Sequence, residues 1–153
     1  MNSLLSVDNL ASAQNDVLFG ANVTNNNACF VIIRRNGTFV PNVTSTQLSS
    51  QLPGGQSGIA DVFAFFPYDI SVDTPPFFSS RPIGGDDNVT YSAWYSGQAL
   101  NARGLNFPTQ PGNVVVTPAA FFSFTRLTVD LEANRPDPFP AGNYSAEAIV
   151  RCE

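Results

Sequence analysis

Hydrophobic and polar residues alternate along much of this chain, which is the pattern of β-strands that bury one face. The last stretch shows it most clearly, because a turn rich in Pro, Gly and Asn is followed by alternation that continues to the end. One face of this stretch is polar apart from Ile149. The apolar face consists of Tyr144, Ala146, Ala148, Val150 and Cys152. We therefore expect residues 144–152 to form a half-buried strand.

A second clear alternation lies near the start of the chain and predicts a strand over residues 16–23. Its apolar face consists of Val17, Phe19, Ala21 and Val23. Runs of β-branched and aromatic residues predict the other strands. These cover residues 29–33, 38–40, 59–66 with its continuation at 68–72 after Pro67, 88–96, 114–117 and 121–131. Asn36-Gly37 lies between two of them and is typical of a tight hairpin turn.

The spacing of these segments indicates the fold class. Roughly seven or eight strands with frequent turn signals, and no amphipathic helix, are typical of an all-β sandwich. The long connections at 43–58 and 97–112 favour Greek-key crossovers over simple hairpins. A chain of 153 residues is expected to form one domain. We assign residues 16–153 to that domain and residues 1–15, which are polar and weakly patterned, to an N-terminal arm.

The composition argues against several kinds of chemistry. The chain has no His and no Lys, and its seven Arg face twelve carboxylates, for a net charge of -5. Without His there is no Ser-His or Cys-His relay and no imidazole metal ligand. Two cysteines are too few for a thiolate zinc site or an iron–sulfur cluster. We therefore expect no catalytic residue, no metal and no cofactor, and predict that the protein is not an enzyme.

Two classes of partner are also unexpected. The Arg residues are scattered, with no run longer than Arg34-Arg35, whereas nucleic-acid binding needs a concentrated basic surface. No apolar run approaches the length of about 20 residues that crosses a bilayer. The sequence therefore predicts neither nucleic-acid binding nor membrane insertion.

Cys29 and Cys152 lie far apart and form no CxxC motif, which predicts one structural disulfide. The alternative is a pair of buried free thiols. A disulfide implies an oxidising compartment, so we expect an extracellular or cell-surface protein. The opening residues 1–8 lack the basic start and long apolar stretch of a signal peptide. We expect a mature or recombinant chain whose leader is missing.

Several short motifs occur in a familiar order along the chain. They are Val17-Phe19-Ala21-Val23 before Cys29, then Asn36-Gly37-Thr38, Gln47-Leu48-Ser49-Ser50 with Gly54-Gly55 and Gly58, Ile70-Ser71-Val72, and Ala141-Gly142-Asn143-Tyr144 leading into Val150-Arg151-Cys152. This order resembles secreted pilin-like proteins of the spore coat protein U and archaic chaperone–usher type. The resemblance covers most of the chain through loose motifs, of which the terminal A-G-x-Y with its strand is the most specific.

The resemblance implies an immunoglobulin-like Greek-key sandwich that lacks one strand. In such pilins an N-terminal segment of the neighbouring subunit fills the open groove by β-augmentation. The implied partners are identical subunits, with a periplasmic chaperone and an usher during assembly. The donor is residues 3–13, residues 16–23, or absent. The implied donor side chains are Leu5, Val7, Leu10, Val17, Phe19, Ala21 and Val23, and the implied acceptor edge is Tyr144, Ala146, Ala148 and Val150.

Asn-x-Ser/Thr sequons offer candidate glycosylation sites, although a chain rich in Asn, Ser and Thr also produces them by chance. They start at Asn22, Asn36, Asn42, Asn88 and Asn143. A cation could bind through oxygens at Asp86-Asp87-Asn88, with Asp69 and Asp73. This spacing fits no calcium-loop signature, so we favour a solvated turn.

Aromatic residues suggest two surfaces. Tyr91, Trp94 and Tyr95 are a candidate carbohydrate platform, although we favour core packing for such residues. Phe65-Phe66 and Phe77-Phe78 each place one ring on either face of an extended segment. Some Phe residues are then exposed, and exposed apolar patches mark partner contacts. We therefore expect packing against another subunit.

Three functions remain open. The first is a pilin-like structural subunit of an extracellular filament assembled by donor-strand exchange. The second is a monomeric secreted adhesin or carbohydrate-binding sandwich whose N-terminal arm folds back on its own edge. The third is a viral capsid or tail decoration protein, which would account for Met1 without a leader.

Overall fold

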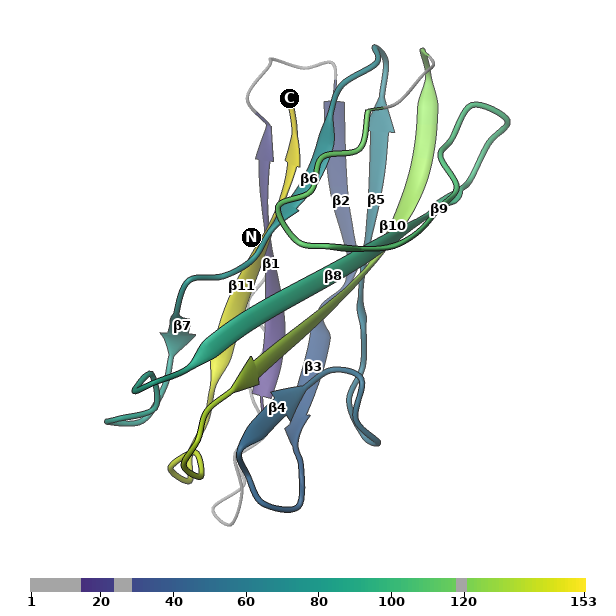
Figure 1. The fold of residues 1–153 in the computed structure, drawn as a ribbon. Helices are drawn as coiled ribbons and strands as arrows, with labels where there is room; N and C mark the ends of the chain where they lie inside the picture. The colour runs from purple at the N-terminus through teal and green to yellow at the C-terminus, as the bar shows by residue number, and fades with distance from the viewer. Residues whose placement is uncertain (1–14, 24–28, 118–120) are drawn as a thin grey trace.

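The computed structural model describes residues 15–23, 29–117 and 121–153, and every regular element in these ranges is a β-strand (Figure 1). No described segment is a helix long and apolar enough to cross a membrane. The strands are β1 (Asn15–Val23), β2 (Cys29–Arg35), β3 (Gly37–Pro41), β4 (Gln47–Ser49), β5 (Gly58–Ala64), β6 (Ile70–Asp73), β7 (Phe78–Ser80), β8 (Thr90–Ala99), β9 (Phe107–Pro111), β10 (Ser123–Asn134) and β11 (Ser145–Cys152). The prediction of an all-β fold is confirmed.

The strands form two mainly antiparallel sheets, an arrangement compatible with a β-sandwich. One sheet runs β2-β5-β10-β8-β9, with β10 at its centre. The other places β1 between β3 and β11, and β11 also pairs with β6 and β7. The short strand β4 joins the two sheets because it pairs with both β3 and β10. Side chains from both sheets, such as Val62, Leu127, Val72 and Val150, share one buried core.

The two longest alternating segments fold as the pattern predicts. Along β10, residues at odd positions such as Leu127 and Val129 are buried, while those at even positions such as Arg126 are partly exposed. In β11 the predicted apolar face is buried and the face with Glu147 and Ile149 is partly exposed. Alternation of this kind positions both strands with one face on the core.

The structure corrects the prediction at Asn36-Gly37, which does not form a hairpin turn. The flanking strands do not pair with each other, because β2 pairs with β5 while β3 pairs with β1 and β4. Asn36 is buried at the point where the chain leaves one sheet for the other. Tertiary packing overrides the local turn preference here.

Other differences concern short strands. The sequence missed β4, β7 and β9, which have three to five residues each and little alternation. Two prolines lie within β9, as is common in edge strands because Pro cannot donate a ladder hydrogen bond. The strand expected over residues 114–117 is reduced to an isolated bridge between Val116 and Ile70.

Candidate functional site

The candidate functional site is the seam between the first and last strands. β1 runs parallel to β11 from the Val17–Ala146 pair to the Val23–Cys152 pair (Figure 1). On its other side β1 pairs antiparallel with β3, with Asn15 opposite Phe39. A segment predicted as a candidate donor strand therefore occupies the edge of β11 within its own chain.

The register of this seam places candidate donor residues of β1 opposite candidate acceptor residues of β11 within one chain. The pairs are Val17 with Ala146, Phe19 with Ala148 and Ala21 with Val150, and Val23 lies opposite Cys152. On β11 all of these residues are buried. The other candidate donor residues, Leu5, Val7 and Leu10, lie outside the described part of the chain.

Tyr144 is buried but does not belong to the ladder, which begins at Ala146. The Tyr144 hydroxyl donates a hydrogen bond to the Pro140 carbonyl at 2.6 Å. Its ring packs edge-on against Phe78 and Phe139, with centroids 4.9 and 5.5 Å away. The role of Tyr144 in this structure is to fix the turn that leads into β11.

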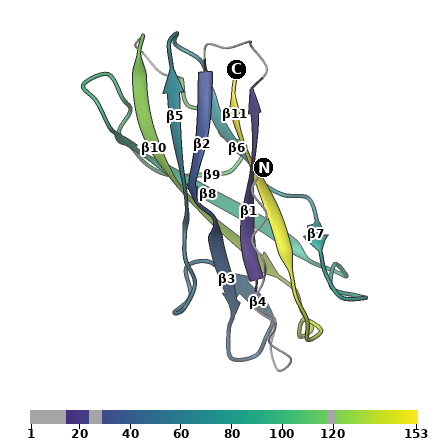
Figure 2. The same ribbon diagram turned by 180° about the vertical axis from the view of Figure 1, so that it is seen from behind.

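The disulfide predicted between Cys29 and Cys152 is present, and both residues are buried. It joins the start of β2 to the end of β11, with the Cα atoms 6.4 Å apart. The covalent loop closed by this bond contains β2 to β11, whereas β1 precedes Cys29 and lies outside the loop (Figure 2). β1 is thus attached to the sandwich by one covalent connection and by its two ladders.

A row of phenylalanines crosses the outer face of β2, β5 and β10, and we call it the aromatic ladder. Its members meet edge to face, with ring centroids 4.8–5.9 Å apart. They are Phe30, Phe63, Phe65, Phe122 and Phe124. Phe30 is 45% exposed and Phe122 is 54% exposed, so the ladder presents rings to solvent. Such a patch suits contact with another protein surface.

The two Phe pairs, Phe65-Phe66 and Phe77-Phe78, differ in their surroundings. Phe78 is buried whereas Phe77 is 59% exposed, as alternation requires. Neither Phe65 nor Phe66 enters the core. Phe65 joins the aromatic ladder, and Phe66 packs against Phe121 with centroids 5.8 Å apart, because β5 ends at Ala64 and the chain leaves the sheet there.

A charged cluster lies next to the aromatic ladder on the same outer face. Asp61 is only 1% exposed and accepts hydrogen bonds from Arg126 at 2.7 and 2.9 Å and from Arg34 at 2.7 Å. The Arg126 hydrogen bond is the main cause that holds the pKa of Asp61 below its usual value, against the opposing effect of burial. The carboxylate therefore stays ionised and ties three neighbouring strands together.

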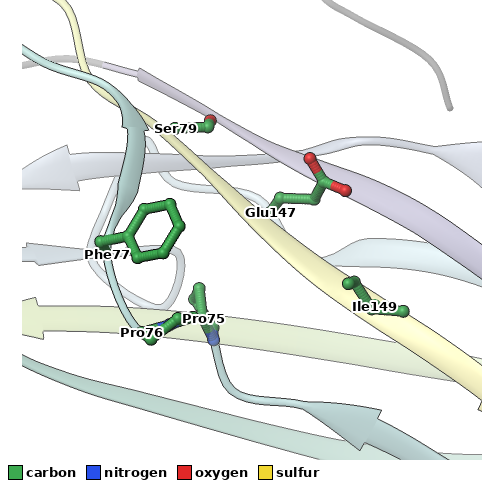
Figure 3. Close-up of a pocket in the computed structure, with 6 residues that line it drawn as sticks. All are labelled: Pro75, Pro76, Phe77, Ser79, Glu147 and Ile149. Atoms are coloured by element: carbon green, nitrogen blue, oxygen red, sulfur yellow. The ribbon is translucent and has the colours of Figure 1, made fainter.

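A pocket of about 270 Å³ lies on the outer side of β11, where the chain departs from the sheet between β6 and β7 (Figure 3). β6 pairs with β11 from Ile149 onwards and β7 pairs only with Ser145 and Ala146. Pro75 and Pro76 interrupt the edge between them, because proline has no N–H to donate. The lining residues are Pro75, Pro76, Phe77, Ser79, Glu147 and Ile149.

The predicted sequons differ in their surroundings. Asn36 is buried, and Asn42 is held in its loop because its side-chain oxygen accepts hydrogen bonds from the backbone N–H groups of Thr46 and Gln47. Asn88 is exposed in the loop before β8, and Asn143 is half-buried before β11. Asn22 lies in β1, and its side chain is outside the described residues. Asn88 is therefore the most open of the described sequons.

The acidic residues considered for a cation are not gathered into one site. Asp86 accepts hydrogen bonds from the Tyr91 hydroxyl and the Phe78 N–H and pairs with Arg81. Asp73 pairs with Arg151 at 2.5 Å. Within the described residues, no group of acidic side chains is arranged to hold a metal ion.

The candidate carbohydrate platform is not formed. Tyr95 is buried, and Tyr91 packs against the core with its ring 5.1 Å from Phe78. Trp94 occupies the alternate position between Ala93 and Tyr95, on the opposite face of β8. The favoured interpretation, core packing, is correct for both tyrosines.

Comparison with known proteins does not extend this picture. The chain matches no protein-family model and no curated protein. The resemblance to pilin-like proteins therefore stays a prediction, and the functional argument rests on the seam itself.

Proposed function

We propose that this protein is a structural subunit of an extracellular filament in which residues 15–23 of one subunit pair with β11 of the next. The observation that carries the proposal is that β1 fills the edge of β11 while lying outside the covalent loop closed by Cys29 and Cys152. An arm tethered at one point is able to leave its own sheet and enter a neighbour's sheet. The same ladder pairs then form between chains, as in domain swapping.

The seam also explains why the edge of β11 should be filled in every subunit. A sheet without β1 exposes the backbone of β11 and β3 together with the buried side chains of Ala148 and Val150. An open, apolar edge of this kind promotes pairing with other chains. Each subunit is therefore stable only when its edge is filled, either by its own arm or by a neighbour's.

The tether limits the geometry of the filament. The backbone from Val23 to Cys29 spans at most about 20 Å when extended. The β11 strand that receives the arm therefore has to end near Cys29 of the donor. The proposal further includes an immunoglobulin-like sandwich in which β1 stands in for the strand that such pilins lack, and an oxidising, extracellular location in keeping with the disulfide.

A second candidate function is a self-contained secreted binding domain, such as an adhesin. The observation that favours it is the pairing of β1 with β11 of the same chain, which leaves no open edge on β11 at that side. The two candidates share one fold and differ only in whose arm fills the seam. The viral alternative gains no support from the described residues.

Cross-linking separates the two candidates. Phe19 and Ala148 lie opposite each other in the ladder, so cysteines at these positions meet the spacing for a disulfide. We expect co-expressed single variants Phe19→Cys and Ala148→Cys to form a dimer that is lost on reduction. A control pair, Leu18→Cys with Ala148→Cys, is one position out of register and should cross-link weakly.

The native material provides the complementary measurement. We expect a ladder of multimers on electrophoresis that collapses only after boiling in detergent, together with thin fibres by electron microscopy. Deletion of residues 2–23 should abolish both. Cross-linking only within a Phe19→Cys, Ala148→Cys double variant, with a single monomer band, would instead establish the self-contained domain.

A further inference from the structure

The pocket beside β11 contains a carboxylate that has no partner among the described residues. Glu147 lines the same hollow as Phe77 and Ile149 (Figure 3). Its carboxylate makes no hydrogen bond or ion pair with any described residue. The remaining wall is apolar apart from Ser79. A carboxylate at the mouth of an apolar hollow suits a cation carried on an apolar stem, and among side chains only Arg and Lys have this form.

The described part of the chain carries an arginine that is equally without a side-chain partner. Arg103 lies exposed in the loop between β8 and β9, and its guanidinium contacts no hydrogen-bond acceptor or carboxylate among the described residues. The other arginines all have such partners, and they are Arg34, Arg35, Arg81, Arg126, Arg135 and Arg151. Since the sequence has no Lys, Arg103 is the cationic side chain among the described residues that is free to complement Glu147.

Arg103 and Glu147 cannot meet within one molecule. The loop between β8 and β9 projects on the side of the sandwich away from β7, as both Figure 1 and Figure 2 show. The pocket lies beside β7 and β11. Two complementary groups on opposite sides of a molecule can be joined only between copies, and such a head-to-tail contact generates open chains unless its rotation closes a ring.

We propose that Arg103 of one copy inserts into the pocket of the next copy and pairs with Glu147. A guanidinium is able to bind a carboxylate through two parallel hydrogen bonds, and its stem can lie along Pro76 and Ile149. The face of the exposed Phe77 ring offers a cation–π contact in addition. The volume of about 270 Å³ lies below that of usual small-molecule sites, roughly 300–1,000 Å³, and fits a single side chain.

This inference rests on the proposed self-association but not on strand exchange. The test is reciprocal charge exchange, with Arg103→Glu and Glu147→Arg made separately and then together, and self-association measured by sedimentation velocity. We expect each single variant to weaken association by about tenfold and the double variant to restore it. The effect should shrink at high salt, because ions screen exposed charges.

Matched controls separate a specific pair from a change in net charge. Asp137→Arg alters the charge by the same amount as Glu147→Arg at an exposed site, and Ala102→Glu adds a carboxylate next to an intact Arg103. Combining Asp137→Arg with Arg103→Glu, or Ala102→Glu with Glu147→Arg, should not restore self-association. Loss in both singles without recovery in the double variant would overturn the pairing.

The outcomes also distinguish this inference from the proposed function. A heat-resistant ladder that forms normally in all charge variants, with unchanged sedimentation, would overturn the Arg103–Glu147 contact while leaving strand exchange intact. Charge-dependent association without any heat-resistant ladder on electrophoresis would overturn strand exchange while supporting the Arg103–Glu147 contact. A wild-type protein that stays monomeric at all concentrations would overturn both.

Discussion

Val23 and Cys152 are paired at the end of the parallel ladder between β1 and β11, and Cys152 is also bonded to Cys29, the first residue of β2. The strand pairing therefore ends where the covalent loop closes. This relationship leaves β1 as an arm that can detach without the breaking of a covalent bond, while β2 to β11 stay cross-linked.

The disulfide should stabilise the sandwich without being needed for the pairing of β1. Replacing Cys29 and Cys152 with Ser together should lower the free energy of unfolding by about 4 kcal/mol, since the bond closes a loop of more than 100 residues. Denaturant unfolding with and without reductant checks this value. A wild-type protein whose stability is unchanged by reductant would contradict it.

The buried face of β11 should tolerate no increase in side-chain size. Ala148 is fully buried, so Ala148→Leu should cost about 1–3 kcal/mol through overpacking and should weaken the seam with β1. Ile149, the next residue, is partly exposed on the opposite face, and Ile149→Leu is the matched control. The expected result is a lower denaturation midpoint for the first variant only. Equal effects at both positions would contradict the register of the ladder.

The Asp61 cluster should make the free energy of unfolding depend on pH in the acid range. Because the folded pKa of Asp61 is lowered, its contribution is present above the unfolded value near 3.8 and is lost as the pH falls through the folded pKa. Asp61→Asn should cost about 1–3 kcal/mol near neutral pH, since it removes charge-assisted hydrogen bonds from Arg34 and Arg126. The two arginines are partly exposed and can turn to solvent, which limits the cost.

Unfolding curves of wild type and Asp61→Asn between pH 7 and strongly acid conditions provide the measurement. The difference between the two proteins should shrink as the pH falls below 3.8. Asp137→Asn, at an exposed turn, should change little. A constant difference across the range would show that the loss comes from packing rather than from ionisation.

Three tyrosines should resist ionisation in the folded protein. Burial raises the pKa of Tyr95 and of Tyr144 to about 12, and burial with the Asp86 hydrogen bond raises the pKa of Tyr91 further. Since these folded values lie above the unfolded value of 10, their contribution is complete below pH 10 and is lost as the pH rises through about 12. Absorbance titration should show these residues ionising together with unfolding.

Tyr144→Phe removes the hydroxyl and keeps the ring, so it separates the contributions of these two groups to the titration. The variant loses the hydrogen bond to the Pro140 carbonyl, at a cost of about 1 kcal/mol, and retains the packing on Phe78. At neutral pH the variant should be less stable, but it lacks one group whose ionisation drives unfolding. Its free energy of unfolding should therefore fall less steeply between pH 10 and about 12, with one fewer tyrosine in the high-pH step. An unchanged step would mean that Tyr144 is not among the residues that resist ionisation.

Alternation located the long strands β10 and β11, because both bury alternate residues such as Leu127 and Val150. It did not identify the partner of residues 16–23, since a pattern of apolar positions specifies a buried face and not the neighbour that covers an edge. Asn36-Gly37 illustrates the same limit: its local preference for a hairpin is overridden where β2 leaves its sheet and continues as β3.

The pocket and the aromatic ladder were only partly accessible to sequence reasoning. The pairs Phe65-Phe66 and Phe77-Phe78 did signal exposed rings, and Pro75-Pro76 lacks the N–H groups that continue a strand pairing. The prolines lie beside Glu147 because β6 and β7 share the edge of β11. This pairing joins residues about 70 positions apart, so no local sequence pattern predicts it.

The position of the disulfide also determines how a filament of these subunits would carry tension. A pull that enters a subunit through the strand seated on its β11 reaches Cys152, crosses to Cys29 and continues into the arm held by the next subunit. The strands from β2 to β10 lie outside this path and bear no load. A strong pull would then load only the pairing between each β11 and the arm inserted beside it. In a reduced filament, the force would instead pass through the strands from β2 to β10 and unfold each subunit.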